Sequence, residues 1–258
     1  MAAVSAVKKE LRQKVHKILK SLPQESVAAQ STIVTDKLCA LPEYLQAKRI
    51  SVFLSMPTGE ISTTRIVQDA LASGKEVFIP YTHNLETVPK VSMMDMLRLE
   101  SMQEFNALEP DRWGIPSLNK SCIATKQNCF GGLGVAADRL RSAKEDLGLD
   151  LIIMPGMAFD TSMRRLGHGK GYYDHFLNRY SSEIQGSPRA AKRPFLGKRT
   201  ALPHHEQFQS IMLTTPLHAV VALALKEQII LPPDEVPVAN HDQLVDAVVV
   251  GDGRLLSS

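Results

Sequence analysis

Short apolar runs alternate with amphipathic segments along this chain, and this alternation constrains the fold more than any other feature. Runs typical of buried strands occur at residues 49–56, 75–82, 149–155, 218–225 and 246–251. Helical patterns occupy residues 1–22, 25–40, 63–74 and a segment that begins at Tyr172. Alternating strands and helices favour a mostly parallel sheet with helices on both faces. We therefore predict a three-layer α/β fold.

The length of the chain favours a single domain. With 258 residues, 44% of them hydrophobic, residues 1–258 can bury one large core. Two stretches of weak periodicity, residues 117–138 and 181–216, interrupt the pattern and are expected to be surface insertions. The second is rich in proline and basic residues and has little apolar surface, which predicts a mobile loop.

Charge and cysteine content exclude several classes of partner. The net charge is only +3, and the basic residues of 181–216 are interleaved with a single aromatic residue, Phe195, so we expect no nucleic-acid partner. No apolar run reaches the length of a bilayer span, so we expect no membrane partner. The three cysteines lack metal-site spacing, which favours a reducing compartment. We expect a cytoplasmic protein, with a mitochondrial location as the alternative because the N-terminal segment is basic and amphipathic.

Residues 164–174, RRLGHGKGYYD, follow the apolar run LDLIIMPGMAFD and form a strand-loop-helix junction. Backbone N–H groups at the start of a helix, glycines and cationic side chains together make a phosphate site. The motif is not a Walker A loop, because Gly171 follows Lys170 where that loop has serine or threonine. It is not a dinucleotide fingerprint either, because Tyr172 stands where the third glycine is required. Alternating glycines allow positive φ and a close approach to an anion.

The order and spacing of several segments resemble those of the 5-formyltetrahydrofolate cyclo-ligase family. These segments are KKELR, FLSMPTGEIST, MDMLRLE, RWGIP, PGMAFD, RRLGHGKGYYD, ALALKEQI and VPVANHD. The resemblance implies an α/β three-layer fold, in agreement with the pattern analysis. It also implies an ATP-driven closure of 5-formyltetrahydrofolate to 5,10-methenyltetrahydrofolate that requires Mg²⁺ and releases ADP and phosphate.

The resemblance assigns residues to ATP. Its implied ATP contacts are Lys8, Lys9, Arg12, Arg165, Leu166, Gly167, His168, Gly169, Lys170, Gly171, Tyr172 and Tyr173. Lys8 and Arg12 lie four apart, so a helix places them on one face, where both can address the same phosphate chain. Lys170, Arg165 and Arg12 are the implied catalytic residues, which neutralise charge during phosphoryl transfer.

The resemblance also assigns residues to the metal and the folate. Asp174 and Asp242 match magnesium ligands, and two carboxylates with phosphate oxygens and water suit this ion. The implied folate-binding residues are Leu54, Met56, Glu60, Trp113 and Tyr173. A carboxylate such as that of Glu60 can accept hydrogen bonds from the N–H groups of the pterin ring.

The implied mechanism is phosphorylation of the formyl oxygen by ATP, followed by attack of N10 and loss of phosphate. A non-catalytic reduced-folate or nucleotide binding protein is the alternative, and a sugar-phosphate isomerase is a third reading supported by fold analogy alone. Retention of Lys170, Asp174 and Asp242 favours the enzyme. We expect a monomer whose partners are the small molecules 5-formyltetrahydrofolate and ATP.

Overall fold

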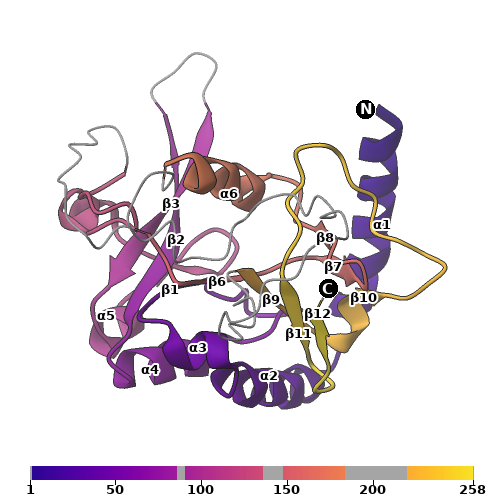
Figure 1. The fold of residues 1–258 in the computed structure, drawn as a ribbon, viewed down its shortest axis with the longest axis horizontal. Coiled ribbons are helices and arrows are strands. Elements are labelled where there is room, and N and C mark those ends of the chain that lie inside the picture. The colour runs from indigo at the N-terminus through magenta and orange to yellow at the C-terminus, as the bar shows by residue number, and fades with distance from the viewer. Residues whose placement is uncertain (1, 86–90, 136–147, 184–219, 258) are drawn as a thin grey trace, which may run out of the picture.

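Seven strands form the central sheet of the protein, which the computed structural model describes over residues 2–85, 91–135, 148–183 and 220–257 (Figure 1). The strands lie in the order β12-β11-β9-β6-β1-β2-β3. Neighbouring strands from β11 to β2 run parallel, whereas β12 and β3 pair antiparallel at the two edges. The prediction of a mostly parallel sheet is confirmed.

The elements have the following bounds. The central sheet contains β1 (Arg49–Val52), β2 (Glu76–Asn84), β3 (Ser92–Leu99), β6 (Leu151–Met154), β9 (Val220–Ala224), β11 (Ala247–Val250) and β12 (Leu255–Ser257). Two smaller sheets contain β4 (Glu109–Pro110) with β5 (Pro116–Ser117), and β7 (Ala158–Asp160) with β8 (Arg165–Leu166) and β10 (Ile229–Ile230). The described α-helices are α1 (Ala2–Lys20), α2 (Gln24–Cys39), α3 (Pro42–Gln46), α4 (Thr64–Ala72), α5 (Met102–Asn106) and α6 (Tyr172–Glu183). Two 3₁₀ helices are η1 (Lys120–Thr125) and η3 (Lys226–Gln228).

A hydrophobic core lies on each face of the central sheet. Side chains alternate along β6, where Leu151 and Ile153 belong to one core and Ile152 and Met154 to the other. Helices α2 and α4 cover the first core, and α6 covers the second (Figure 1). Because both faces are covered, every residue of β6 is buried, which explains why this strand is a continuous apolar run. The three-layer, single-domain prediction is confirmed.

Strands β1 and β3 of the central sheet differ from the sequence prediction, and β12 was not predicted either. Strand β1 ends at Val52, whereas the predicted strand continued to residue 56. Leu54 lies beyond the strand but is buried, so the apolar pattern continued past the end of the strand. Strand β3 was not predicted, because the polar residue Asp95 lies at its centre. Asp95 is fully buried, and its carboxylate pairs with Arg179 of α6 at 2.6 Å and with the His83 ring of β2 at 2.8 Å. These partners offset the cost of burying the charge.

The prediction of a surface insertion at residues 117–138 needs correction for the described part, residues 117–135. Cys129 is fully buried in the core beneath α6, and Leu118 and Ile123 belong to the opposite core. These buried side chains are spaced irregularly among glycines and polar residues, so neither helical nor strand periodicity revealed them. Most of the second predicted insertion, 181–216, lies outside the described residues.

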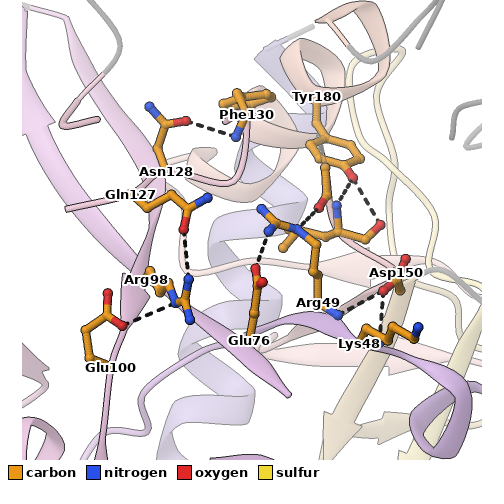
Figure 2. A network of polar contacts seen from close by, with 12 residues as sticks. Lys48, Arg49, Glu76, Arg98, Glu100, Gln127, Asn128, Phe130, Asp150 and Tyr180 are labelled. Atoms are coloured by element: carbon orange, nitrogen blue, oxygen red, sulfur yellow. Dashed lines mark hydrogen bonds and ion pairs between the residues drawn. The ribbon is translucent and has the colours of Figure 1, made fainter. Parts of the chain in front are cut away.

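Polar contacts fix the amino-terminal end of β1 (Figure 2). The Asp150 carboxylate accepts hydrogen bonds from the backbone N–H groups of Lys48 and Arg49 at 2.9 and 2.8 Å. The Tyr180 hydroxyl of α6 contacts both backbone groups of Leu149, just before β6. These contacts join β1, β6 and α6 at the amino-terminal ends of the two strands. The loops that follow β1 and β6 lie at the opposite ends.

The order of the strands changes direction at β1, because β2 lies on one side of it and β6 on the other. In open α/β sheets, ligands bind outside the carboxyl ends of the strands at such a point. The chain leaves the carboxyl ends of β1 and β6 through residues 53–63 and 155–171. These two segments contain Leu54, Met56 and Glu60 and the glycine-rich loop that the sequence analysis singled out.

Candidate active site

Helix α1 contributes two cations beside the glycine-rich loop, which we define as residues 167–171. The Arg12 Nε group donates a hydrogen bond to the Gly167 carbonyl oxygen at 2.8 Å. One turn earlier, the Lys8 ammonium forms an ion pair with the Asp242 carboxylate. Burial lowers the pKa of Arg12, and the nearby Asp242 carboxylate opposes this effect. Lys8 and Arg12 therefore both lie near Asp242, which Lys8 contacts and whose charge acts on Arg12.

Glycines allow the cationic groups to approach the loop closely. Gly169 and Gly171 have φ angles of +101° and +68°, a region that other residues rarely adopt. A Cβ atom on Gly169 would lie 3.4 Å from Cζ of Arg12, and one on Gly167 would lie 2.8 Å from Nη1 of Arg165. A side chain at Gly167 would thus displace the Arg165 guanidinium, whereas at Gly169 the strain would come from the positive φ.

The two predicted metal ligands come from neighbouring segments. Asp174, in the first turn of α6, pairs through Oδ2 with Nη2 of Arg165 at 2.9 Å. Its Oδ1 atom accepts a hydrogen bond from the backbone N–H of Gln243 at 3.0 Å. Because Gln243 follows Asp242, this bond brings the C-terminal segment to the start of α6. Sequence reasoning did not identify Gln243, since only its backbone takes part.

The Asp242 carboxylate is held in its charged form. Burial by itself raises the pKa of Asp242, but the hydrogen bond from Lys8 and the backbone N–H of Ala239 outweigh this effect. The net result is a lowered pKa. Asp242 is therefore an anion at neutral pH, as a metal ligand must be.

A cavity of about 410 Å³ lies beside the segment that follows β1. Its wall includes Ser31 of α2, Leu54, Met56, Glu60, Phe105 of α5 and Gly114. Glu60 is only 7% exposed, and its Oε2 atom accepts a hydrogen bond from the backbone N–H of Met56 at 2.8 Å. Polar residues such as Ser55 and Thr63 also line this wall, and a partly apolar wall with one oriented carboxylate is a common form of small-molecule site. The structure thus brings together three of the five predicted folate-binding residues.

Two residues of the phosphate motif lie next to Glu60. The Nε2 atom of His168 is 3.8 Å from Oε1 of Glu60. Burial and then the Glu60 charge raise the pKa of Tyr173, whereas Arg165 lowers it, so the Tyr173 hydroxyl lies within the field of both groups. The Cζ atom of Arg165 lies 5.9 Å from the centre of the Tyr173 ring. The glycine-rich loop and the cavity are therefore adjacent parts of one site.

Other predicted residues occupy less central positions. Lys9 and Lys170 are exposed, Tyr172 is half-buried and Leu166 is buried in the core. Trp113 is 46% exposed, and the guanidinium of Arg112 stacks on its ring at 3.8 Å. The wall of the cavity includes its neighbour Gly114 but not Trp113.

Asp160 is a residue of this region that the sequence analysis missed. It is 2% exposed, and its Oδ1 atom accepts hydrogen bonds from the backbone N–H groups of Ser162 and Arg164. Its Oδ2 atom accepts from Nε of Arg164 at 2.7 Å and from the backbone N–H of Val236 at 2.9 Å. Asp160 thereby links the turn before the phosphate motif to the segment that carries Asp242. An acidic residue directly after the apolar run of PGMAFD was the available signal.

The described residues contain no group of three or more His, Cys, Asp or Glu side chains that could hold a metal ion. Asp174 and Asp242 can supply two carboxylates, each now paired with a cation of the protein. Mg²⁺ is usually bound by one or two carboxylates, and phosphate oxygens and water complete its shell. The donor set fits a magnesium ion that arrives with a nucleotide.

Comparisons with known proteins find relatives along most of this chain. A family model described as the 5-formyltetrahydrofolate cyclo-ligase family matches residues 4–192. The 5-formyltetrahydrofolate cyclo-ligase of Mus musculus is 32% identical over 254 residues, which cover 98% of each chain. The probable 5-formyltetrahydrofolate cyclo-ligase of Caenorhabditis elegans is 31% identical over 249 residues, covering 96% of this chain and 95% of the relative.

A solved structure shares the fold. The 5,10-methenyltetrahydrofolate synthetase of Aquifex aeolicus superposes with a TM-score of 0.59 at 24% identity, covering 97% of this chain and 92% of that one. At this identity the likeness supports the architecture of the sheet and its helices.

Proposed function

Because this chain belongs to the 5-formyltetrahydrofolate cyclo-ligase family, we propose that it uses ATP and Mg²⁺ to close 5-formyltetrahydrofolate to 5,10-methenyltetrahydrofolate. The observation that carries this proposal is the junction of two sites. Arg12 and Arg165 lie against the glycine-rich loop, and Glu60 joins that loop to the cavity. An ATP-driven reaction on a folate needs these two sites side by side.

The nucleotide part of the proposal has support from charge and backbone geometry. Arg12, Arg165 and Lys8 converge where the loop leads into the N-terminus of α6. Lys170 projects from the loop as an exposed cation. Such groups stabilise the negative charge of phosphoryl oxygens, most strongly when they are held in place before the reaction. We assign Arg12, Arg165 and Lys170 to neutralising charge on the transferred phosphoryl group.

The folate part has support from the cavity. Its apolar wall at Leu54 and Met56 suits the flat pterin ring, and the buried Glu60 carboxylate can accept hydrogen bonds from the ring N–H groups. Glu60 also faces His168 of the loop. We place the N5 substituent of the bound pterin towards the nucleotide, because its formyl oxygen must meet the γ-phosphate.

The chemistry follows from the difficulty of the reaction. An N-formyl oxygen is a poor leaving group, so attack of N10 on the formyl carbon stalls unless this oxygen is first activated. In the first step the formyl oxygen attacks the γ-phosphorus of ATP, and the bond from phosphorus to the oxygen of ADP breaks. In the second step N10 attacks the formyl carbon and loses its proton, and phosphate leaves with the electrons of the C–O bond. The side chains need only align the substrates and stabilise charge.

Asp174 and Asp242 would hold the magnesium ion of the nucleotide. When bound, this ion neutralises phosphate charge and orients the phosphate chain. In the protein alone, Asp174 forms an ion pair with Arg165, and Asp242 forms one with Lys8. Lys8 keeps Asp242 ionised, and Arg165 holds Asp174 in position before the nucleotide binds.

Partners and location follow the same proposal. We propose that the small molecules ATP and 5-formyltetrahydrofolate are the partners of a cytoplasmic monomer. None of the described helices is long and apolar enough to cross a membrane.

An absorbance assay tests the proposed function. Purified protein mixed with 5-formyltetrahydrofolate, Mg²⁺ and ATP is expected to produce the absorbance of the methenyl product, with one ADP and one phosphate for each ring closed. Arg12→Ala should lower kcat/KM for ATP by about 10²-fold, because a preorganised charge is lost. Lys14→Ala, an exposed residue of the same helix, is the matched control and should leave it unchanged. Folate binding without ATP-dependent product would refute the proposal.

A further inference from the structure

The hydroxyl group of Tyr173 is buried and has no hydrogen-bond partner among the residues that the structure describes. Buried polar groups nearly always have a partner, because leaving a hydroxyl unpaired costs the full penalty of its desolvation. This unpaired hydroxyl lies in the motif that the proposed function assigns to ATP. We therefore look for an acceptor on the ligand, since the fold supplies none among the described residues.

Tyr173 lies where the two substrate sites meet. Its side chain packs against both hydrophobic cores. This places it at the carboxyl ends of the strands, between the two layers of helices. Arg165 of the phosphate motif lies against its ring, at 5.9 Å from Cζ to the ring centre. The charge of Glu60, the carboxylate of the cavity, also acts on its hydroxyl.

The hydroxyl is a hydrogen-bond donor rather than a base. A tyrosine phenol, whose ordinary pKa is about 10, keeps its proton at neutral pH. It can therefore donate a hydrogen bond to an acceptor atom of a ligand. Under the proposed function, Glu60 holds the pterin ring and Arg165 holds phosphate. The acceptor that lies between a pterin ring and the γ-phosphate is the oxygen of the N5-formyl group.

We propose that the Tyr173 hydroxyl donates a hydrogen bond to the formyl oxygen of 5-formyltetrahydrofolate. This inference rests on the proposed function and gives Tyr173 a specific role, recognition of the group undergoing reaction. One lone pair of the formyl oxygen accepts from Tyr173, and the other is directed at the γ-phosphorus. Tyr173 keeps its proton through both steps. The contact also distinguishes 5-formyltetrahydrofolate from reduced folates that lack this oxygen.

Binding of two folates to the full-length protein tests the inference without relying on turnover. Calorimetric titration with 5-formyltetrahydrofolate and with 5-methyltetrahydrofolate, which has no formyl oxygen, compares wild type with Tyr173→Phe. We expect the variant to bind the formyl compound about tenfold more weakly and the methyl compound equally well within twofold. An equal loss for both folates, or no loss for either, would overturn the inference. If wild type binds neither folate, the proposed function itself is wrong.

Thermal stability gives an independent readout, with Tyr180→Phe of the same helix as the matched control. The Tyr180 hydroxyl contacts both backbone groups of Leu149, so removing it should lower the melting temperature. Removing the unpaired Tyr173 hydroxyl should leave the melting temperature of the ligand-free protein unchanged or raise it. Tyr180→Phe should not discriminate between the two folates. A fall for Tyr173→Phe as large as that for Tyr180→Phe would show a structural role and overturn the inference.

Discussion

Replacement of Asp160 by asparagine tests whether one buried carboxylate holds the two halves of the nucleotide site together. Asp160 accepts four hydrogen bonds, from Ser162, from the backbone and side chain of Arg164, and from Val236. Asparagine has the same shape but only one acceptor oxygen. Its NH₂ group would face two of these donors, so two bonds to a charged group are lost.

The size of the effect follows from these contacts. Two hydrogen bonds to a charged group, at about 1.5 kcal/mol or more each, give a loss of about 3 kcal/mol in the free energy of unfolding. For a chain of 258 residues, an unfolding entropy of about 2.1 cal/mol/K per residue converts this loss into a fall of about 6 °C in Tm. Differential scanning calorimetry measures the fall directly.

Glu235→Gln is the matched control for this prediction. Glu235 contacts the same Arg164 side chain at 2.7 Å, but 64% of its own side chain is exposed. Exposed ion pairs contribute little to stability, so its Tm should stay within about 2 °C of wild type. Equal Tm values for the two variants, or a change below about 2 °C for Asp160→Asn, would refute the reasoning.

Asp160→Asn should also alter the nucleotide site while the protein is folded. The bond to Val236 anchors the segment that leads to Asp242. At 20 °C the variant should therefore need more Mg²⁺ for half-maximal activity, whereas Glu235→Gln should not. An unchanged Mg²⁺ titration would show that Asp160 contributes to folding stability but not to the nucleotide site.

Three further predictions concern single residues. Lys170→Met should lower kcat by about 10²-fold or more at unchanged Tm, because the exposed loop lysine acts on the transition state rather than on the core; wild-type turnover would remove it from the mechanism. Asp174→Asn and Asp242→Asn should each raise the Mg²⁺ concentration needed for activity, and an unchanged titration would show that the residue is not a ligand. Burial and then the nearby Asp69 raise the pKa of Cys39 to about 11. Because only the thiolate reacts, its rate of alkylation by iodoacetamide, followed by mass spectrometry, should keep rising through pH 10; a plateau near pH 9 would contradict this.

The fold was largely predictable because its central strands are buried on both faces. Strands β6 and β11 contain only apolar residues, so they stood out as apolar runs. Strand β3 did not, because Asp95 is buried within it through partners on β2 and α6. Those partners lie 12 and 84 residues away in the chain, beyond the reach of any local pattern.

The candidate site divides in the same way. The glycine-rich loop was predictable from its own residues, since glycines at positive φ and nearby cations form a local pattern. The roles of Asp242 and Glu60 came only from resemblance to a family. Asp160 and the backbone of Gln243 were missed, because their contacts join segments 76 and 69 residues apart. Tertiary packing creates such contacts, and the spacing of residue types does not encode them.

The fate of the formyl oxygen tests the proposed reaction most directly. 5-Formyltetrahydrofolate labelled with ¹⁸O in its formyl group is converted by the purified protein with ATP and Mg²⁺, and the released phosphate is analysed by mass spectrometry. Phosphorylation of the formyl oxygen predicts one ¹⁸O atom in the phosphate for each methenyl product formed. Unlabelled phosphate, with the ¹⁸O recovered in water, would contradict the account.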